Sequence, residues 1–422
     1  MTRRQWMAIA TCTLSGAILP PRLLAAQREH SPDLEARISH VISQYERQGF
    51  HRTGTDVDRR SGDWLYEEVI RIGLTPERES FELNRVDPGE CHVLIGNRRI
   101  EGLPLFDGTF TDRIGIRGRL GPLGSDAEIG LVEAPPNTSA AGPLGDARRQ
   151  LRHRGLICIT RGGRPGLCPS NADFFLRPYG PPVLQVSSEE SSFLSEQAQR
   201  NADVTLIAAV RRRPQKAFNV AAQITGKNPT LPPLVVMTPR SGWYACASER
   251  GGGIACWLEL MRTFVAAEPA RDVIFVASSG HELGHLGIDT FVERRPSIVS
   301  NSVGWIHLGA NVGAAILPGS TTQGTTIQAS DDEFEGLLGD AMTASDLRIG
   351  RRNSRGTIPG GEAEVVHRGG GRYVSVIGSN SLFHNPSDRG QEVVNVPEIA
   401  RFAGAFGDLA RTLIIRPRQV GR

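Results

Sequence analysis

The sequence predicts an α/β fold in which a doubly wound, mainly parallel sheet has helices on both faces and carries an inserted β-rich lobe. From Asn219 onward, short β-branched runs alternate with helical patterns, which is typical of parallel strands joined by crossover helices. A middle block, residues 155–210, instead holds short strands around one helix. The length of 422 residues is enough for two or three such units.

Two helices and several strands are expected before the middle block. Residues 31–49 have one apolar face and begin with Ser31 and Pro32, which suit a cap and a first turn. A second helix is predicted from about residue 60 to 72, where Gly73 is a typical stop. Residues 80–135 are interspersed with glycine and proline, so short strands are expected there.

The middle block reads as a separate lobe. Residues 155–160 and 204–210 are apolar strand patterns, and a basic helix is expected at 144–154. Ser187 to Glu190 has the spacing of a capping box that would open a helix to about residue 201. The basic run at 211–214 is interpreted as an exposed joint.

The last part of the chain supplies the alternating pattern. Its apolar, β-branched runs predict four strands, and its longer apolar-faced segments predict two helices. The strands are expected at 234–237, 272–277, 303–308 and 373–377, and the helices at 251–267 and 396–414.

The N-terminal stretch predicts export. Residues 2–7 resemble a twin-arginine pattern, an apolar run at 7–19 follows, and small residues at 24–26 offer a cleavage site. The run is too short to span a bilayer. We therefore expect a periplasmic or extracellular protein with no stable membrane insertion after cleavage. An uncleaved N-terminal anchor is the alternative.

Charge and cysteine content exclude some partners. The chain has 48 Lys and Arg against 45 Asp and Glu, and residues 1–26 contain three of the arginines and no acidic residue. The exported form is thus close to neutral, and no basic stripe is visible, so nucleic acid and anionic membranes are not expected as partners. Cys158 and Cys168 either form a disulfide or, like the other cysteines, are buried thiols.

The stretch that ends in His281-Glu282-Leu-Gly-His285 is the first candidate for a reaction centre. It follows a predicted buried strand, and ligand sites in open α/β sheets lie where strands end. The letters match HExxH, in which His281 and His285 would bind zinc and Glu282 would be the base of a zincin protease. That motif needs a helix through its middle, and Gly284 disfavours one.

The order of parts resembles a known family. Residues 52–55 before a helix with Trp64, the strand and glycines over 271–287, and Phe383-His-Asn-Pro-Ser-Asp388 are similar to segments of the zinc aminopeptidases of the leucyl-aminopeptidase and glutamate-carboxypeptidase type. Residues 155–210 resemble the protease-associated (PA) lobe inserted in some of them. The resemblance covers roughly residues 34–415.

The resemblance implies a division of the chain. An export signal would occupy residues 1–26. A catalytic α/β domain would be formed by residues 31–95 and 216–422. A PA-like lobe, residues 96–215, would be inserted between these two parts.

The resemblance also implies a ligand set, but this sequence departs from it. The family holds two zinc ions with histidines and carboxylates. Here Pro239 and Ser241 stand where the first strand should end in histidine and aspartate, and Glu249 takes the position of a bridging aspartate. The loss of the first-strand ligands argues against an intact two-zinc site.

The remaining positions imply a rebuilt site. His281-Glu282 replaces a pair of glutamates, His307 replaces an aspartate, and His384 matches the last histidine ligand. Glu282, His307 and His384 would hold one zinc ion rather than two, because two histidines, a glutamate and a water are a sufficient catalytic set.

The expected function is hydrolysis of a peptide or small amide by metal-bound water. His281 or Glu249 would accept the proton, and Arg240 and Arg250 would hold a substrate carboxylate. Two simpler interpretations stay open: Glu249 as an acidic residue at a helix start, and the arginines as solvated surface charge. A metal-free periplasmic peptide-binding protein is the alternative function, and the oligomeric state is left open.

Overall fold

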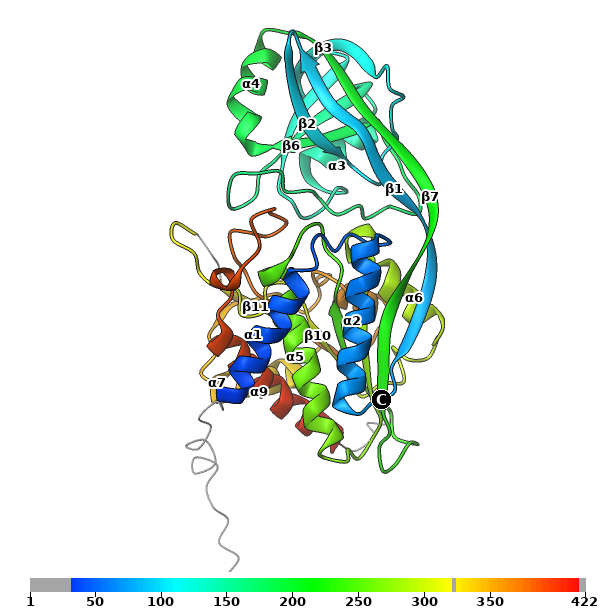
Figure 1. The fold of residues 1–422 in the computed structure, drawn as a ribbon, viewed down its shortest axis with the longest axis vertical. Helices are drawn as coiled ribbons and strands as arrows, with labels where there is room; N and C mark the ends of the chain where they lie inside the picture. The colour runs from blue at the N-terminus through cyan, green and yellow to red at the C-terminus, as the bar shows by residue number, and fades with distance from the viewer. Residues whose placement is uncertain (1–31, 321–323, 417–422) are drawn as a thin grey trace, which may run out of the picture.

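The computed structural model describes residues 32–320 and 324–416, so the predicted export signal lies outside the described residues. Two lobes are joined by a long antiparallel ribbon of β1 (Glu77–Ile95) and β7 (Asp203–Ile224) (Figure 1). The prediction of short strands was wrong here. The basic run at 211–214 is exposed and lies within this connecting ribbon, where it pairs with residues 84–87, so it is a paired strand segment and not a loop.

The distal lobe, at the top of Figure 1, is a closed sheet with two helices, α3 (Gly142–Gln150) and α4 (Ser191–Gln199). Its strands run in the order β1-β2-β6-β5-β4-β3-β7, and β1 also pairs with β7. This closure leaves an apolar interior that includes Ile157, Leu184 and Leu206. The added strands are β2 (Arg98–Pro104), β3 (Ile116–Pro122), β4 (Ile129–Ala134), β5 (Gly155–Thr160) and β6 (Val183–Ser187).

The predicted capping box in this lobe does not form as expected. The Ser187 hydroxyl accepts a hydrogen bond from the backbone N–H of Glu189, two residues on, at 3.2 Å. A short 3₁₀ turn, Ser188–Glu190, therefore precedes α4.

The proximal lobe contains the doubly wound sheet, which confirms the predicted fold class. Its strands run in the order β7-β9-β8-β10-β13-β11-β12, and the four central ones, β9, β8, β10 and β13, are parallel. β11 and β12 were not predicted. The bounds are β8 (Leu234–Pro239), β9 (Val273–Ser278), β10 (Gly304–Leu308), β11 (Thr325–Ala329), β12 (Ile349–Arg352) and β13 (Tyr373–Ile377).

Helices cover both faces of this sheet. In β8, Leu234 and Val236 pack into one apolar layer and Val235 and Met237 into the other, because successive strand side chains point to opposite faces. The larger layer is formed with α1 (Pro32–Glu46), α2 (Asp56–Ile72), α5 (Ala247–Val265), α7 (Asp332–Ala344) and α9 (Val396–Ile414), and the smaller with α6 (Leu286–Glu293) and α8 (Ala363–Arg368).

The glycines at the start of α5 bring this helix close to its surroundings. A Cβ on Gly252 would lie 1.9 Å from the carbonyl oxygen of Val312, and one on Gly253 would lie 2.7 Å from the Thr238 hydroxyl. Only glycine allows this approach. The run therefore sets how α5 packs on the sheet, and so where Glu249 and Arg250 lie.

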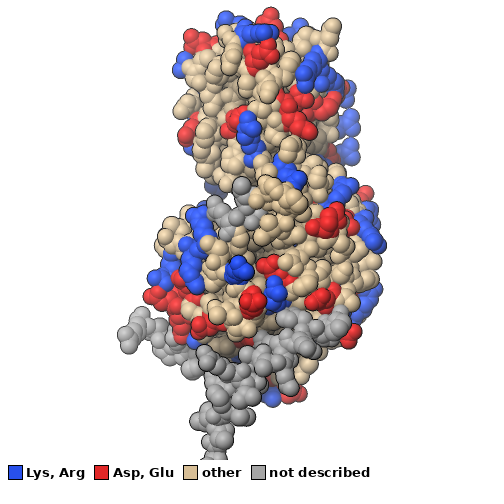
Figure 2. Space-filling view, turned by 90° about the vertical axis from the view of Figure 1, so that its left-hand side faces the viewer, with Lys and Arg blue, Asp and Glu red and all other residues tan. Residues whose placement is uncertain are grey.

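The surface agrees with the expected charge balance. On the face that Figure 2 displays, basic and acidic side chains are mixed over both lobes. No helix among the described residues is long and apolar enough to cross a membrane. Cys91, Cys158, Cys168, Cys246 and Cys256 are free and buried, so the structure has the buried thiols and not the Cys158–Cys168 disulfide.

Candidate functional site

The carboxyl ends of the central parallel strands bring the predicted site residues to one edge of the sheet, as expected for this fold. His281 and Glu282 follow β9, His307 lies in β10, and His384 lies in the loop after β13. Glu249 is in the first turn of α5, which follows β8. The side chains nevertheless fall into two separate groups, one enclosed and one lining a cavity.

The HExxH stretch is not a helix. His281–Leu283 forms a single 3₁₀ turn, and Gly284 (φ 73°) and His285 (φ 65°) are both left-handed. The rings of His281 and His285 lie 5.0 Å apart between centroids, but they are not stacked one helical turn apart. The structure therefore contradicts the helical geometry that a zincin requires.

Arg250 is the centre of the enclosed group. Its Nη2 lies 2.8 Å from Glu249 Oε1 and 2.7 Å from Glu282 Oε1, and its Nε donates to the carbonyl oxygen of Ser241 at 2.7 Å. All three charged side chains are almost completely buried. One guanidinium thus bridges two of the carboxylates that were predicted to take part in catalysis.

The other oxygens of these carboxylates also have partners within the chain. The Ser241 hydroxyl donates to Glu282 Oε2 at 2.8 Å, and the Cys246 thiol lies 3.6 Å from Glu249 Oε2. Burial alone would raise the pKa of Glu249, but Arg250 and His384 hold it at about 2. Glu249 is therefore ionised at neutral pH and acts here as an ion-pair partner.

His384 also faces Glu249. Its Nδ1 lies 2.6 Å from the carbonyl oxygen of Pro169, which accepts, so Nδ1 donates. Its Nε2 lies 3.5 Å from Glu249 Oε1 and has no hydrogen-bond partner. The same loop supplies Asp388, whose carboxylate accepts from the backbone N–H groups of Ser248 and Glu249 and so caps α5.

Arg240 forms a second buried ion pair. Its Nη1 donates to Asp58 Oδ1 at 2.8 Å, and its Nη2 donates to the carbonyl oxygen of Phe218 at 2.5 Å. Arg240 and Arg250 are each no more than 1% exposed, and neither lines the cavity. This corrects the expectation that they face a cleft and are free to hold a substrate carboxylate.

The second group lines a cavity of about 580 Å³ between the two lobes. His281, His285 and His307 form its histidine wall. The distal lobe contributes Asn137, Thr138, Ala140, Asn171, Asp173 and Phe174, and the proximal lobe adds the charged side chains of Asp289, Glu364 and Arg368. The cavity has the size of typical ligand sites.

Glu362, which the sequence did not single out, lies beside the cavity-lining His281. It is fully buried at the start of α8. One of its oxygens, Oε1, lies 3.4 Å from His281 Nδ1 and accepts from the Ser278 hydroxyl. Burial raises the pKa of Glu362. Nothing in its flanking sequence, Gly360-Gly361-Glu362-Ala363, marks it as functional.

Several buried polar atoms beside the cavity have no hydrogen-bond partner in the described structure. They are His281 Nδ1, His307 Nε2 and Glu362 Oε2. His307 is fixed through its other nitrogen, which lies 2.8 Å from the Ser375 hydroxyl. Burial, with Arg250, lowers the pKa of His281 to about 3, and burial with His281 and His285 lowers that of His307 well below its usual range. Both rings are neutral.

Gly361 completes this wall. A Cβ at this position would lie 3.0 Å from His307 Cε1 and 3.5 Å from His281 Cε1. The residue also has a left-handed φ of 66°, which favours glycine. A side chain here would therefore crowd both imidazole rings at the same point of the wall.

The predicted zinc ligands do not fit a zinc ion as they are placed. Glu282 is engaged by Arg250 and Ser241, His384 faces Glu249, and His307 belongs to the cavity wall. Within residues 32–320 and 324–416, no three His, Cys, Asp or Glu side chains are grouped so that they could hold a metal ion. The chemistry of the site is therefore derived from the chain's own groups.

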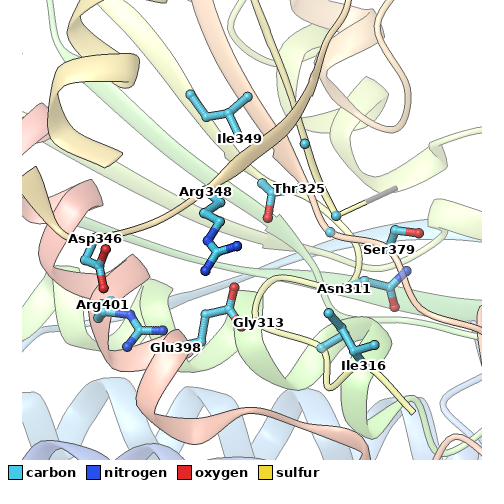
Figure 3. Close-up of a pocket in the computed structure, with 14 residues that line it drawn as sticks. Asn311, Gly313, Ile316, Thr325, Asp346, Arg348, Ile349, Ser379, Glu398 and Arg401 are labelled. Carbon is cyan, nitrogen blue, oxygen red and sulfur yellow. The ribbon is translucent and has the colours of Figure 1, made fainter. Parts of the chain in front are cut away.

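A second cavity, of about 590 Å³, lies beside the start of α9 (Figure 3). Its charged lining residues are balanced: Asp346 and Glu398 stand with Arg348 and Arg401. Asn311 and Ser379, which follow β10 and β13, also line it. None of the predicted site residues does, so it is separate from the histidine-lined cavity.

Comparisons with known proteins identify the fold. No protein-family model matches the sequence, and no curated protein matches it. Solved structures do match. A zinc aminopeptidase from Bacillus subtilis aligns with a TM-score of 0.73 at 16% identity, over 90% of this chain and 94% of the other.

Two further structures give the same result. A peptidase M28 precursor from Shewanella amazonensis aligns with a TM-score of 0.72 at 15% identity, over 95% of this chain and 97% of the other. An aminopeptidase from Aneurinibacillus sp. strain AM-1 aligns with a TM-score of 0.67 at 15% identity, over 91% and 96%. At such identities the likeness establishes the fold alone: the chain has the fold of these peptidases over nearly its whole length.

Proposed function

We propose that the protein is an exported hydrolase of peptide or related amide bonds and that the bond is cleaved in the cavity between the lobes. The observation that carries this proposal is the set of buried polar atoms without partners beside the cavity, on His281, His307 and Glu362. A buried polar group without a hydrogen bond costs about 1–3 kcal/mol, and groups left in this state cluster at functional sites.

The geometry supports a carboxylate–imidazole pair as the reacting unit. Glu362 would orient His281 through Nδ1, which leaves Nε2 to accept a proton from a water molecule. The water oxygen would attack the amide carbonyl carbon, and the C–N bond would break as the imidazolium returns that proton to the leaving amine. His307 Nε2 would donate a hydrogen bond to the carbonyl oxygen.

Zinc has no step in this proposal. The fold is that of proteins that include a zinc aminopeptidase, but Glu282, one of the three residues expected to hold zinc, is already engaged by Arg250 and Ser241. Arg250, which neutralises two carboxylates, also favours a second candidate: capture of a peptide in the same cavity without cleavage.

A turnover assay separates these possibilities. The purified protein is incubated with a peptide mixture and with aminoacyl amides, with and without a metal chelator, and products are identified by mass spectrometry. Cleavage that survives the chelator and disappears in His281→Ala is the expected result. Peptides that bind but stay intact would support capture, and activity lost to the chelator and restored by zinc would contradict the metal-free reaction.

Ligand binding should strengthen between pH 5 and 7. Asp289 lines the cavity, and burial together with Glu293 raises its pKa to about 6. The carboxyl group is neutral below that value and negative above it, so a peptide with a charged amino end should gain about 1 kcal/mol, roughly fivefold in Kd. Calorimetric titration at both pH values measures the change.

Two comparisons control this measurement. An N-acetylated peptide lacks the positive amino group and should show no such gain. Asp289→Asn should reduce the dependence for the free peptide, and the remainder should come from Asp173, which lines the same cavity and whose pKa burial also raises to about 6. An equal pH dependence for both peptides would exclude Asp289 as the cause.

A further inference from the structure

A cation already lies between two of the carboxylates at the sheet edge. Arg250 Nη2 is 2.8 Å from Glu249 Oε1 and 2.7 Å from Glu282 Oε1. The guanidinium is fully enclosed, and its Nε is fixed by the Ser241 carbonyl. Its position is therefore set by the fold and not by chance contact at a surface.

A third donor, His384, faces one of these carboxylates. His384 Nε2 lies 3.5 Å from Glu249 Oε1, and this buried nitrogen has no hydrogen-bond partner. Because Nδ1 donates to Pro169, Nε2 is the ring nitrogen left to bind a cation placed beside this carboxylate. Two ligands of one tetrahedral zinc are about 3.4 Å apart when each bond is 2.0–2.2 Å, so the spacing is that of a ligand pair.

We propose that Arg250 is a resident cation in the place of a metal ion, and that Glu249, Glu282 and His384 form a latent divalent-metal site that opens only when the guanidinium is removed. Two carboxylates and an imidazole are a sufficient protein donor set for zinc.

Space and charge explain why the native chain keeps the site closed. A zinc ion bonded to Glu249 Oε1 and Glu282 Oε1 would need the position that Nη2 occupies, since this nitrogen touches both oxygens. It would also place two positive charges in contact in an enclosed region, where charge interactions are strong. The latent site does not depend on whether the cavity hydrolyses its ligand.

Metal content of Arg250 variants tests the proposal. The wild-type protein and Arg250→Ala are equilibrated with zinc, desalted and assayed by elemental analysis. We expect about one zinc ion per chain in Arg250→Ala, no zinc above the buffer level in the wild type, and a melting temperature that rises with zinc in the variant alone. Arg250→Ala/Glu282→Gln should lose the zinc again.

Arg240→Met is the matched control. Arg240 is equally buried and is also ion-paired, with Asp58 at 2.8 Å, but among the described residues it bridges no second carboxylate. This variant should lose stability and gain no zinc. Equal zinc in Arg250→Ala and the wild type, or equal gains in Arg250→Ala and Arg240→Met, would overturn the proposal.

A folding failure still gives an answer. If Arg250→Ala is soluble only when zinc is supplied, the metal has replaced the guanidinium and the proposal holds. If Arg250→Ala does not fold in either condition, the zinc content of the wild-type protein is compared with that of its ligand variants. Zinc in the wild type that disappears in Glu282→Gln or His384→Ala would show that the native site accepts metal, contrary to the proposal.

Discussion

Arg250→Met should lower the free energy of unfolding by about 3–5 kcal/mol in zinc-free buffer, the range for a buried ion pair that loses one partner. Glu249 and Glu282 would remain enclosed without the cation that bridges them at 2.8 and 2.7 Å. Methionine fills much of the same volume, so the loss reports the missing charge more than a cavity. Chemical denaturation measures it.

The control is an ion pair at the surface. Arg59 and Asp63 lie 3.2 Å apart on α2 with much of both side chains exposed, and such pairs contribute less than about 1 kcal/mol. Arg59→Met should therefore be nearly neutral. If Arg250→Met costs no more than Arg59→Met, the bridge has no structural role.

The same bridge predicts how stability changes in acid. The pKa of Glu249 is about 2 in the folded protein against an ordinary value of 4.5. A lowered carboxyl pKa contributes stability that is present above pH 4.5 and is lost as the pH falls toward 2. The wild type should lose this contribution over that range, whereas Arg250→Met should lose much less. Parallel acid curves for the two proteins would contradict the assignment.

Local sequence patterns were sufficient to predict those helices and strands whose own residues show a clear periodicity. The strand Tyr373–Ile377 and the helix Val396–Ile414 have the predicted bounds, because an apolar β-branched run and an amphipathic period mark them directly. The helix Asp332–Ala344 was missed although the signal was present. Asp331 caps it, and Phe334, Leu338 and Met342 follow at helical spacing and are buried.

The ribbon of β1 and β7 shows where local patterns fail. Pro88 and Gly89 suggest a break, but the structure absorbs them as a bulge between Pro88 and Cys91. What keeps β1 extended over 19 residues is its pairing with a segment more than a hundred positions later. Such long-range pairing leaves little trace in either strand alone.

The sequence singled out several residues that lie at this sheet edge but not their arrangement. His281, His307 and the Glu249–Glu282–His384 set do meet at one sheet edge, as strand ends in this fold require. The role of Arg250 depends on Glu282, which lies 32 positions away. The sequence alone therefore left open the interpretation of Arg250 as a solvated surface charge. Glu362 lies in a stretch where no element had been predicted, and its burial became visible only in three dimensions.

Glu362→Gln should lower kcat for amide cleavage by about 10²- to 10⁴-fold while KM changes little. The amide keeps the volume of the carboxyl group and can still accept from Ser278, but its NH₂ would donate to His281 Nδ1 and so fix the wrong tautomer. Glu362 is a positioning residue, because it acts through a ring nitrogen 3.4 Å away. Steady-state kinetics over a range of pH measure both parameters.

Glu364→Gln separates this role from a general effect of charge. Glu364 lines the same cavity and lies two residues further along α8, but it does not contact His281; it lies 4.0 Å from His285 Nδ1 instead. Its substitution removes the same charge and should alter KM with kcat within about twofold, as expected for a residue that only binds. If Glu362→Gln also keeps kcat within about twofold, the pair is not the reacting unit. The orientation of His281 depends on the carboxylate and not on net charge. The kcat of Glu362→Asp should therefore lie between those of Glu362→Gln and Glu364→Gln, because its shorter side chain keeps the carboxylate but places it further from His281.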